Sequence, residues 1–189
     1  MAKQLLVIIT GPPGTGKTTI GKKIAKRFGF TYLSKDIIKE SLFDDLGIKD
    51  REWSRKIGSA SYSILYRIVE EIMAAGQPLV TDSNFKPEYD QKKFKQLITQ
   101  YDYCAIEISC RTEGVVLTKR FKKRFKSGER HPGHVDHINL KEFKKVLSQG
   151  EMEPLNIGGV KIISVDTTDF KAVNYKNIYA SIQKLNSQE

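Results

Sequence analysis

The sequence predicts an α/β fold in which a five-stranded parallel sheet is covered by helices on both faces. Along the chain, short apolar segments alternate with segments whose apolar residues recur at helical spacing. The first apolar segment leads directly into a glycine-rich turn, Gly11-x-x-x-x-Gly16-Lys17-Thr18, and then into an amphipathic helix. With 189 residues and no internal repeat, the chain is expected to form a single domain, 1–189.

The strands are predicted where β-branched and other apolar residues cluster between turn residues. The first is an unbroken apolar run, as expected for a strand that is buried on both faces. We expect strands at 5–9, 30–33, 78–81, 103–109 and 160–165. Ligands of such sheets bind beyond the carboxyl ends of the strands, so polar residues that directly follow a strand are the candidates for a site.

The helices are predicted from apolar stripes and from the glycines that stop them, such as Gly29 and Gly76. In the second helix we expect Ile37, Ile38 and Leu42 to face the core. In the third we expect the same of an apolar stripe that consists of Ile57, Ile64, Leu65, Ile68 and Ile72. The predicted helices are 16–28, 35–46, 53–75, 87–100, 112–126, 140–149 and 172–185.

Composition indicates a globular protein of a reducing compartment. Apolar residues make up 39% and charged residues 29% of the chain, and no apolar run is long enough to span a membrane. The amino-terminal segment leads straight into a core strand, so no signal peptide is expected. Cys104 and Cys110 lack metal-binding spacing and are expected to be reduced, which favours a cytoplasmic location.

The net charge of +10 suits a partner that carries phosphates. Nucleic acid is one such partner, although no known nucleic-acid-binding signature occurs in the chain. A pocket for a polyphosphate is another, and scattered surface lysines are a third explanation. The oligomeric state is left open.

The glycine-rich turn has the Walker A pattern, in the strand–loop–helix setting that its chemistry requires. Backbone amides at the start of the helix form a nest for phosphate oxygens, and the helix dipole adds to it. Lys17 is expected to reach the β- and γ-phosphates, and the Thr18 hydroxyl to ligate Mg²⁺. The nucleotide-binding residues are therefore predicted to be Gly11, Pro13, Gly14, Thr15, Gly16, Lys17, Thr18 and Thr19.

Two aspartates directly follow predicted strands. Asp36 is a candidate for the carboxylate that orients an acceptor hydroxyl and takes its proton, although an Asp in the first helical turn also complements the helix dipole. Asp82 is a candidate Mg²⁺ ligand, although it also suits a turn. Glu107 is a less favourable alternative, because it lies inside its strand.

A basic helix follows the fourth strand. Arg120 and Arg124 are four residues apart and share one helix face, where they could clamp the transferring phosphate and, through Arg120, the nucleotide. A basic surface helix without such a role is the alternative. Arg130, in the loop that follows, is a third candidate.

Further polar residues are candidates for binding the acceptor, which we expect between Asp36 and the segment around Trp53 and Tyr62. His131, His134 and His137 could suggest a metal site, but their spacing fits no standard zinc site. The candidate acceptor-binding residues are Lys39, Arg55, Asn84, Arg130, His131 and His134.

Several motifs occur together in an order that resembles a known family. They are residues 11–19, Ser34-Lys35-Asp36, residues 80–85, Arg120-x-x-x-Arg124 and residues 130–134. In this combination the chain resembles the small P-loop kinase-like proteins of the AAA family, which are relatives of polynucleotide 5′-hydroxyl kinase, chloramphenicol phosphotransferase, gluconate kinase and zeta toxin.

The resemblance implies a P-loop NTPase three-layer sandwich of the nucleoside and nucleotide kinase type, with strand order 2-3-1-4-5 and a helical lid at about 112–137. It implies Asp36 as the base and Arg120 and Arg124 as lid arginines. In polynucleotide kinases an Arg follows the catalytic Asp by three residues, and the chain has Lys39 there, which argues against a polynucleotide acceptor.

The expected function is therefore an ATP- and Mg²⁺-dependent phosphotransferase that acts on a hydroxyl of a small molecule or a nucleic-acid 5′ end. The sequence does not distinguish adenine from guanine: no guanine-reading NKxD run occurs, and ATP is expected only as the default nucleotide. The alternative is a regulatory ATPase or nucleotide-dependent switch whose output is the binding of a partner.

Overall fold

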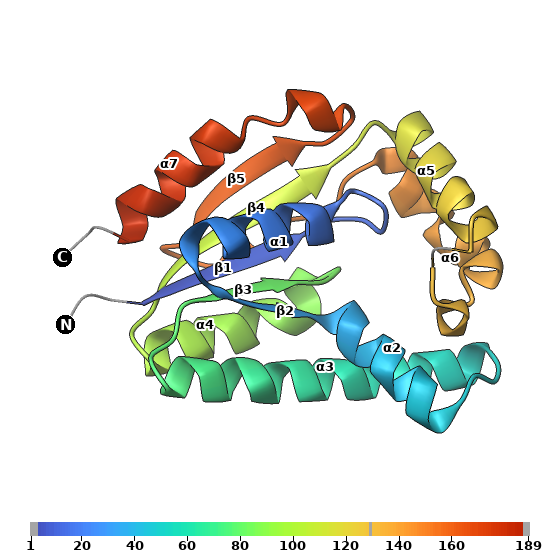
Figure 1. The fold of residues 1–189 in the computed structure, drawn as a ribbon, viewed down its shortest axis with the longest axis horizontal. Helices are drawn as coiled ribbons and strands as arrows, with labels where there is room; N and C mark the ends of the chain where they lie inside the picture. The colour runs from blue at the N-terminus through green and yellow to red at the C-terminus, as the bar shows by residue number, and fades with distance from the viewer. Residues whose placement is uncertain (1–3, 129, 187–189) are drawn as a thin grey trace.

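The computed structural model describes residues 4–128 and 130–186. They form one five-stranded sheet with the order β2-β3-β1-β4-β5, and all neighbouring strands are parallel. This confirms the predicted fold class and strand order (Figure 1). The strands are β1 Leu5–Thr10, β2 Thr31–Ser34, β3 Leu79–Asp82, β4 Cys104–Arg111 and β5 Lys161–Asp166.

Seven α-helices connect and follow these strands in the described part of the chain. They are α1 Lys17–Phe28, α2 Lys35–Leu46, α3 Arg51–Ala74, α4 Lys92–Gln100, α5 Gly114–Lys126, α6 Asp136–Gln149 and α7 Tyr175–Asn186. The predicted helix 87–100 begins instead with a π-helical turn, Pro87–Gln91, where the Asp90 carboxylate accepts from the Lys86 amide. The helix expected from 140 starts at Asp136, after a short 3₁₀ turn, Pro132–His134.

The molecule has three layers. Alternate residues of β1 face opposite sides of the sheet, so Leu5, Val7 and Ile9 pack with α1 and α7. Leu6 and Ile8 pack on the other side, with α3 and α4. Figure 1 shows α1 and α7 on one side of the sheet and α3 and α4 on the other. No described helix has both the length and the apolar character needed to cross a membrane.

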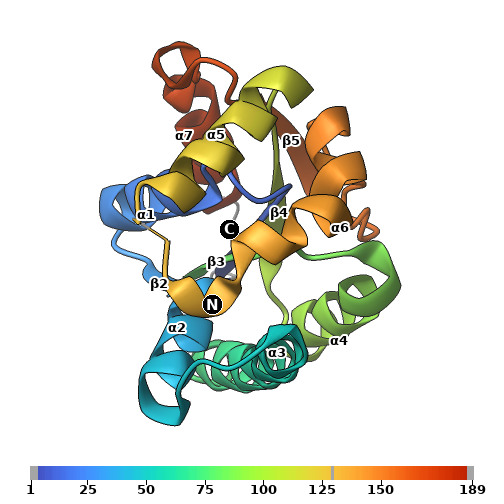
Figure 2. The same cartoon turned by 90° about the vertical axis from the view of Figure 1, so that its right-hand side faces the viewer.

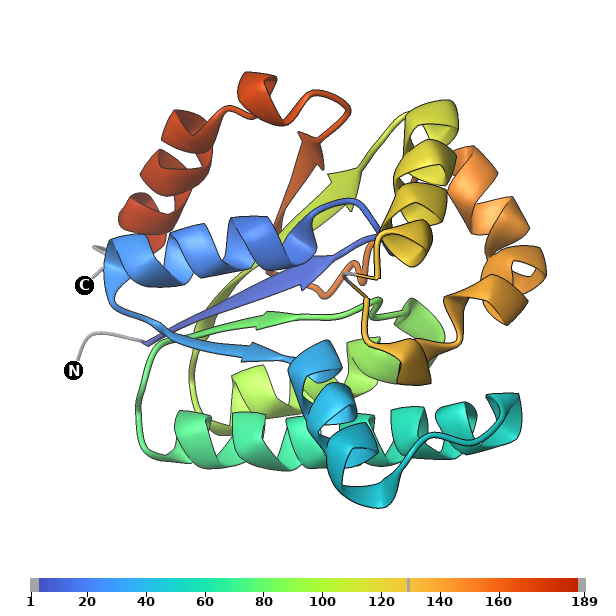
Figure 3. The ribbon, with the colours of Figure 1, turned by 45° about the vertical axis from the view of Figure 1, so that its right-hand side comes forward.

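Helices α5 and α6 have a small core of their own, made of Leu117, Phe121, Leu147 and the half-buried Phe143. The backbones approach closely where the two helices meet, since a Cβ on Gly114 would lie 2.0 Å from the carbonyl oxygen of Ser148. Figures 2 and 3 show this helix pair at the carboxyl end of the sheet, across from α2 and α3. The pair lies where a lid would be expected, so α5 and α6 are called the lid helices below, and residues 130–135 between them are called the lid segment.

The buried faces of α2 and α3 differ in part from the prediction. Ile37 is 47% exposed and Ile64 is 37% exposed, whereas Lys39 and Phe43 of α2 are buried. On α3 the buried positions are Ser54, Ile57, Ser61, Leu65, Val69 and Met73. The expectation was wrong for Ile37 because one side of α2 borders a polar cavity, which Lys35, Asp36 and Lys39 line.

The register of the sheet brings three strand ends to the same level. Asp82, the last residue of β3, pairs with Ile9 on one side and with Ser34 on the other. The chain therefore leaves β1, β2 and β3 at neighbouring points, and the segments that follow are brought together whatever their distance in sequence.

Candidate functional site

A cavity of about 980 Å³ lies beyond the carboxyl ends of the strands. Its walls come from the glycine-rich loop and α1, from α2 and α3, and from the α5–α6 pair. Most of its charged lining residues are cations, and the carboxylates Asp36, Asp82 and Glu142 are the exceptions among the described lining residues.

The glycine-rich loop has the backbone that its sequence predicts. Gly11, Gly14 and Gly16 have φ values of 135°, 92° and 82°, a region that other residues rarely adopt. A Cβ on Gly11 would lie 2.3 Å from the Cys110 carbonyl oxygen, and one on Gly16 would lie 2.2 Å from the Phe170 ring. These two positions therefore require glycine for space as well as for conformation.

Lys17 is buried at the start of α1. Its ammonium group donates to the carbonyl oxygens of Gly11 at 2.8 Å and Pro12 at 2.9 Å, so the loop itself holds the cation. Burial lowers the pKa of Lys17 to about 8, and the carboxylate of Asp82 opposes part of that effect.

Asp82 lies beside the loop, as predicted. Its carboxylate accepts from the Thr18 hydroxyl at 3.0 Å and from the Tyr32 hydroxyl at 3.0 Å. A hydroxyl and a carboxylate oxygen in contact are hard oxygen donors of the kind that Mg²⁺ prefers. Thr18 and Asp82 therefore fit the expected metal site. Burial and then the Asp82 charge raise the pKa of Tyr32, which keeps this phenol protonated as a donor.

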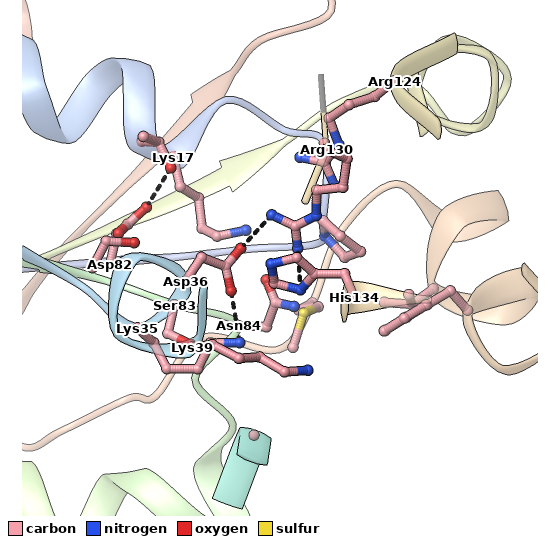
Figure 4. A pocket seen from close by; sticks show the side chains of 18 of the residues that line it. Lys17, Lys35, Asp36, Lys39, Asp82, Ser83, Asn84, Arg124, Arg130 and His134 are labelled. Atoms are coloured by element: carbon pink, nitrogen blue, oxygen red, sulfur yellow. Dashed lines mark hydrogen bonds and ion pairs between the residues drawn. The ribbon is translucent and has the colours of Figure 1, made fainter. Parts of the chain in front are cut away.

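Asp36 lies at the start of α2 between two cations. Lys35 contacts one carboxylate oxygen at 2.7 Å, and Arg130 contacts the other at 2.8 Å. Burial alone would raise the pKa of Asp36, but Lys35 and then Arg130 lower it well below its usual range. Figure 4 shows the carboxylate directed at these two cations. Asp36 is thus held ionised.

The other side of Arg130 contacts His134. The guanidinium lies 2.9 Å from Nδ1 of His134, and Nε2 of His134 lies 2.8 Å from Glu40. Arginine can only donate, so Nδ1 accepts and Nε2 carries the proton that is donated to Glu40. Burial lowers the pKa of His134, while the hydrogen bond to Glu40 opposes it. A neutral His134 with a defined tautomer therefore links the lid segment to α2.

The same lid segment packs on Phe43 of α2. The ring of His131 stacks on Phe43 with centroids 5.6 Å apart, and a Cβ on Gly133 would lie 2.3 Å from the Phe43 ring. His131 pairs with Asp44 at 3.1 Å and is not among the residues that line the cavity. His134, the other histidine predicted to contact the acceptor, does line it.

The metal interpretation of the histidines is not supported by the described residues. His131 and His134 face different carboxylates, Asp44 and Glu40. No group of three metal-ligating side chains of the His, Cys, Asp and Glu types occurs in the described part. The side chain of His137 lies outside the described residues.

Arg120 and Arg124 both line the cavity. The Arg120 guanidinium donates to the carbonyl oxygens of Thr167 and Thr168, both at 2.8 Å, and lies 4.6 Å from the centroid of the Phe170 ring. It thus sits where the segment after β5 meets the glycine-rich loop. Phe170 was not expected in the site, because the sequence offers no signal that this segment returns to the loop.

The other residues predicted to bind the acceptor, Lys39, Asn84 and Arg55, all line the cavity but have different contacts. Lys39 is 7% exposed, lines the cavity and donates to the Ser54 hydroxyl at 3.0 Å. Asn84 lines the cavity, and so does Arg55, which pairs with Glu142 at 2.8 Å. The residues that sequence reasoning did not single out include Glu40, Ser54, Phe170 and the lid residues Phe143 and Val146.

Comparisons with known proteins agree with this geometry. A family model described as an AAA domain (AAA_33) matches residues 6–149, more than half of the chain. The structure is similar to the crystal structure of a protein from Chloroflexus aurantiacus that is provisionally described as a kinase. That protein is 37% identical, with a TM-score of 0.89, and the match covers 96% of this chain and 98% of the other.

Curated relatives are also kinases. An adenylate kinase from Carboxydothermus hydrogenoformans is 38% identical in an alignment of 72 residues that covers 36% of this chain and 34% of that enzyme. A cytidylate kinase from Sulfurisphaera tokodaii is 24% identical in an alignment of 170 residues that covers 82% of this chain and 92% of that enzyme. The match to the adenylate kinase thus spans only about a third of that protein's length.

Proposed function

Because the chain belongs to the AAA-domain (AAA_33) family of P-loop kinase-like proteins, we propose that it transfers the γ-phosphate of ATP to a hydroxyl group in a Mg²⁺-dependent reaction. One observation carries this proposal. The glycine-rich loop, the Thr18–Asp82 pair and the ionised Asp36 line a single cavity, at three neighbouring strand ends. Phosphoryl transfer needs these three components, which are a phosphate cradle, a metal site and a carboxylate at the acceptor.

The loop side binds the nucleotide in this proposal. The amides at the start of α1 and the ammonium group of Lys17 hold the β- and γ-phosphates. Arg124 and Arg120 approach from the lid, and Phe170 with Arg120 offers a flat surface for the nucleobase. Thr18 and Asp82 would hold Mg²⁺, which when bound neutralises charge on the phosphate oxygens.

Asp36 orients the acceptor hydroxyl and takes its proton. The two cations beside Asp36 keep it charged, so it is ready to accept a hydrogen bond at neutral pH. The same cations make it a weak base. Its main contribution is therefore to align the hydroxyl, and the proton moves as the bond to phosphorus forms.

The acceptor carries an anionic group in this proposal. Lys39 is buried against the cavity, and its ammonium group contacts two uncharged groups, the Ser54 hydroxyl at 3.0 Å and the Phe43 ring, whose centroid lies 5.4 Å away. A buried cation is stabilised when a ligand supplies the opposite charge. The small residues Gly58 and Ser59 of α3 line the cavity on this side and leave room for a ligand. A phosphorylated or carboxylated small molecule fits this site, and so does the first phosphodiester of a 5′-hydroxyl nucleic acid.

The cytoplasm is the location that we propose. Cys104 and Cys110 are both free, and Cys110 is buried next to Gly11. Burial raises the pKa of Cys110 to about 12, so its thiol stays protonated and unreactive.

The experiment that tests the function is a transfer screen with γ-labelled ATP. The acceptors should include nucleosides, sugars, their phosphorylated forms, phenicol and aminoglycoside drugs, and 5′-hydroxyl oligonucleotides. For the acceptor that is found, Asp36→Asn is expected to reduce transfer at least about a hundredfold and to leave the Kd of ATP nearly unchanged.

The matched control is Asp45→Asn, which removes an exposed carboxylate from the same helix. This control should transfer phosphate like the wild type. If Asp36→Asn loses ATP binding and transfer in equal measure, the role of Asp36 at the acceptor is wrong.

The regulatory alternative rests on a different observation. The lid segment contacts α2 through Asp36 itself, by the ion pair with Arg130. The same contact suits a nucleotide-dependent switch in which the state of the lid is the output. Slow ATP hydrolysis that no acceptor accelerates, together with nucleotide-dependent binding of a partner, would favour this function over transfer.

A further inference from the structure

Three buried threonines connect the segment after β5 to the glycine-rich loop. Thr15, Thr112 and Thr167 are 0%, 3% and 0% exposed. The Thr167 hydroxyl lies 2.8 Å from the carbonyl oxygen of Thr15, 2.6 Å from the Thr112 hydroxyl and 3.0 Å from the carbonyl oxygen of Arg111. Thr15 and Thr167 are 152 positions apart in the sequence, although Figure 1 shows that both segments lie at the carboxyl end of the sheet.

The direction of these hydrogen bonds follows from the number of protons. A threonine hydroxyl has one proton to donate. The Arg111 carbonyl oxygen already accepts from the Thr167 amide at 2.9 Å. For the Thr15 carbonyl oxygen, the Thr167 hydroxyl is the donor that the described residues provide. The proton of Thr167 therefore points to Thr15, and the Thr112 hydroxyl donates to Thr167.

The Thr15 carbonyl belongs to a peptide group whose other end faces the phosphate site. A trans peptide group is planar, and its C=O and N–H point in opposite directions. A carbonyl oxygen directed at Thr167 therefore turns the N–H of Gly16 to the opposite side, toward the inside of the loop. Gly16 has a φ of 82° and no Cβ, so the backbone at this position would tolerate other orientations of the peptide.

We propose that Thr167 is a positioning residue for the phosphate loop: its hydroxyl holds the Thr15–Gly16 peptide so that the Gly16 amide faces the polyphosphate. This inference rests on the proposed binding of ATP. Thr167 is itself held in place, since its carbonyl oxygen accepts from Arg120 and its amide donates to β4. The hydrogen-bond chain thus joins the phosphate loop to β4 and to the first turns of the lid helix.

The test compares three variants by direct titration with two probes, ATP and inorganic tripolyphosphate. Thr167→Val keeps the shape of the side chain but loses the hydroxyl, and its Kd is expected to rise at least about tenfold for both probes. Thr167→Ser keeps the hydroxyl and should bind both like the wild type. The matched control is Thr112→Val, which removes the donor to Thr167 but leaves the bond to Thr15, and its Kd should change less than about threefold.

The two probes separate the loop from the nucleobase side. Tripolyphosphate has no base, so a loss seen with ATP alone would place the effect at Arg120 and Phe170 and would overturn the proposal. Equal affinities of Thr167→Val and Thr112→Val would overturn it too, even if both unfold at a lower temperature. If Thr167→Val is insoluble, Thr167→Cys keeps the volume with a weaker donor and should show a smaller loss for both probes.

Titration of the wild-type protein tests the proposed function, on which the role of Thr167 depends. If the wild-type protein binds neither ATP nor tripolyphosphate, the proposed function fails. If it binds both and Thr167→Val binds them equally well, only the role of Thr167 is wrong. The KM for the acceptor should be unchanged in Thr167→Val, because Asp36 and Lys39 belong to other elements.

Discussion

At the scale of single residues, the site is built from charges that hold one another in place. Asp36 contacts Lys35 and Arg130, and Arg130 also contacts His134. Each of these side chains restricts the rotamers of the next, so the carboxylate is fixed before an acceptor arrives. Fixing a reacting group in advance reduces the entropy that is lost in the transition state.

The two buried lysines predict how substrate binding depends on pH, Lys17 for the nucleotide and Lys39 for the acceptor. Burial lowers the pKa of Lys17 and of Lys39 to about 8. Below that pH both carry the charge that phosphate binding needs, and above it they lose the charge. The KM for ATP is therefore expected to rise above about pH 8, by up to about tenfold per pH unit for Lys17.

Stability should change in the opposite direction over the same range. The pKa of Lys17 is lower in the folded protein than its ordinary value of 10.5, so the unfolded chain binds more protons between about pH 8 and 10.5. The contribution of Lys17 to the free energy of unfolding thus increases with pH in this window.

ATP titrations from pH 7 to 9 on the wild type and on Lys17→Arg would check the predicted weakening of ATP binding above about pH 8, because arginine does not titrate there. An equally steep pH dependence in Lys17→Arg would contradict the role of Lys17.

At the scale of elements, the lid depends on the close contact between α5 and α6. Gly114 is the first residue of α5, and a Cβ there would lie 2.0 Å from the backbone oxygen of Ser148. Backbone atoms cannot rotate away as a side chain can. Gly114→Ala is therefore expected to separate the two helices and to lower the free energy of unfolding by about 1–3 kcal/mol.

This separation should also affect function, because both helices contribute residues to the cavity wall, such as Arg124 and Val146. We expect a lower kcat and faster proteolysis within the lid, both measured beside urea unfolding. Gly158→Ala is the control, since a Cβ there would meet no atom within 4 Å. If the two variants are equally stable, the backbone contact does not hold the lid together.

The elements also show where sequence patterns succeed and where they do not. The central strand β1 was predicted closely, because a strand buried on both faces is uniformly apolar. The inner face of α2 was predicted incorrectly at Ile37, because apolar periodicity assumes that the buried side of a helix is apolar. That side of α2 faces a charged cavity, which Lys35, Asp36 and Lys39 line.

The site was predictable to the extent that its residues follow strands or lie in local motifs. Lys17, Thr18, Asp36 and Asp82 could be located in this way, although their roles are still predictions. Phe170 and Thr167 could not, because a contact across more than 150 positions leaves no local pattern. The position of His131 also depends on how the lid packs on Phe43, which single-sequence reasoning does not determine.

At the scale of the whole molecule, one buried carboxylate connects the sheet to the segment before β5. Glu107 of β4 is 0% exposed and accepts from the Leu155 amide at 2.9 Å. Burial raises its pKa, and the amides of Leu155 and Asn156 oppose the shift. The side chain faces away from the cavity, as strand alternation predicted, so its role is structural.

This carboxylate predicts a pH dependence of global stability. The pKa of Glu107 is higher in the folded than in the unfolded chain, so its favourable contribution is present in full below about pH 4.5 and is lost as the pH rises through the folded pKa. Glu107→Gln lacks this loss. Relative to the wild type, it should gain stability as the pH rises from about 4.5 to the raised pKa of Glu107 in the folded chain, by up to about 1.4 kcal/mol per pH unit.

Urea unfolding at pH 5, 6 and 7 checks this prediction, with Glu71→Gln as a control on the surface of α3. The control should follow the wild type at every pH. Parallel curves for Glu107→Gln and the wild type would mean that Glu107 titrates normally.

The strand order has a further consequence for the geometry of transfer. The loop that holds the phosphates follows β1 and Asp36 follows β2, and β3 lies between these two strands. Neighbouring strands are about 4.8 Å apart, so donor and acceptor sides are separated by roughly 10 Å. Asp82 ends the intervening strand and stands at the midpoint of that interval. The spacing of the backbone therefore sets the distance that the side chains and the two substrates together have to bridge, and side-chain substitutions can change the chemistry within this interval but not the separation of the strands.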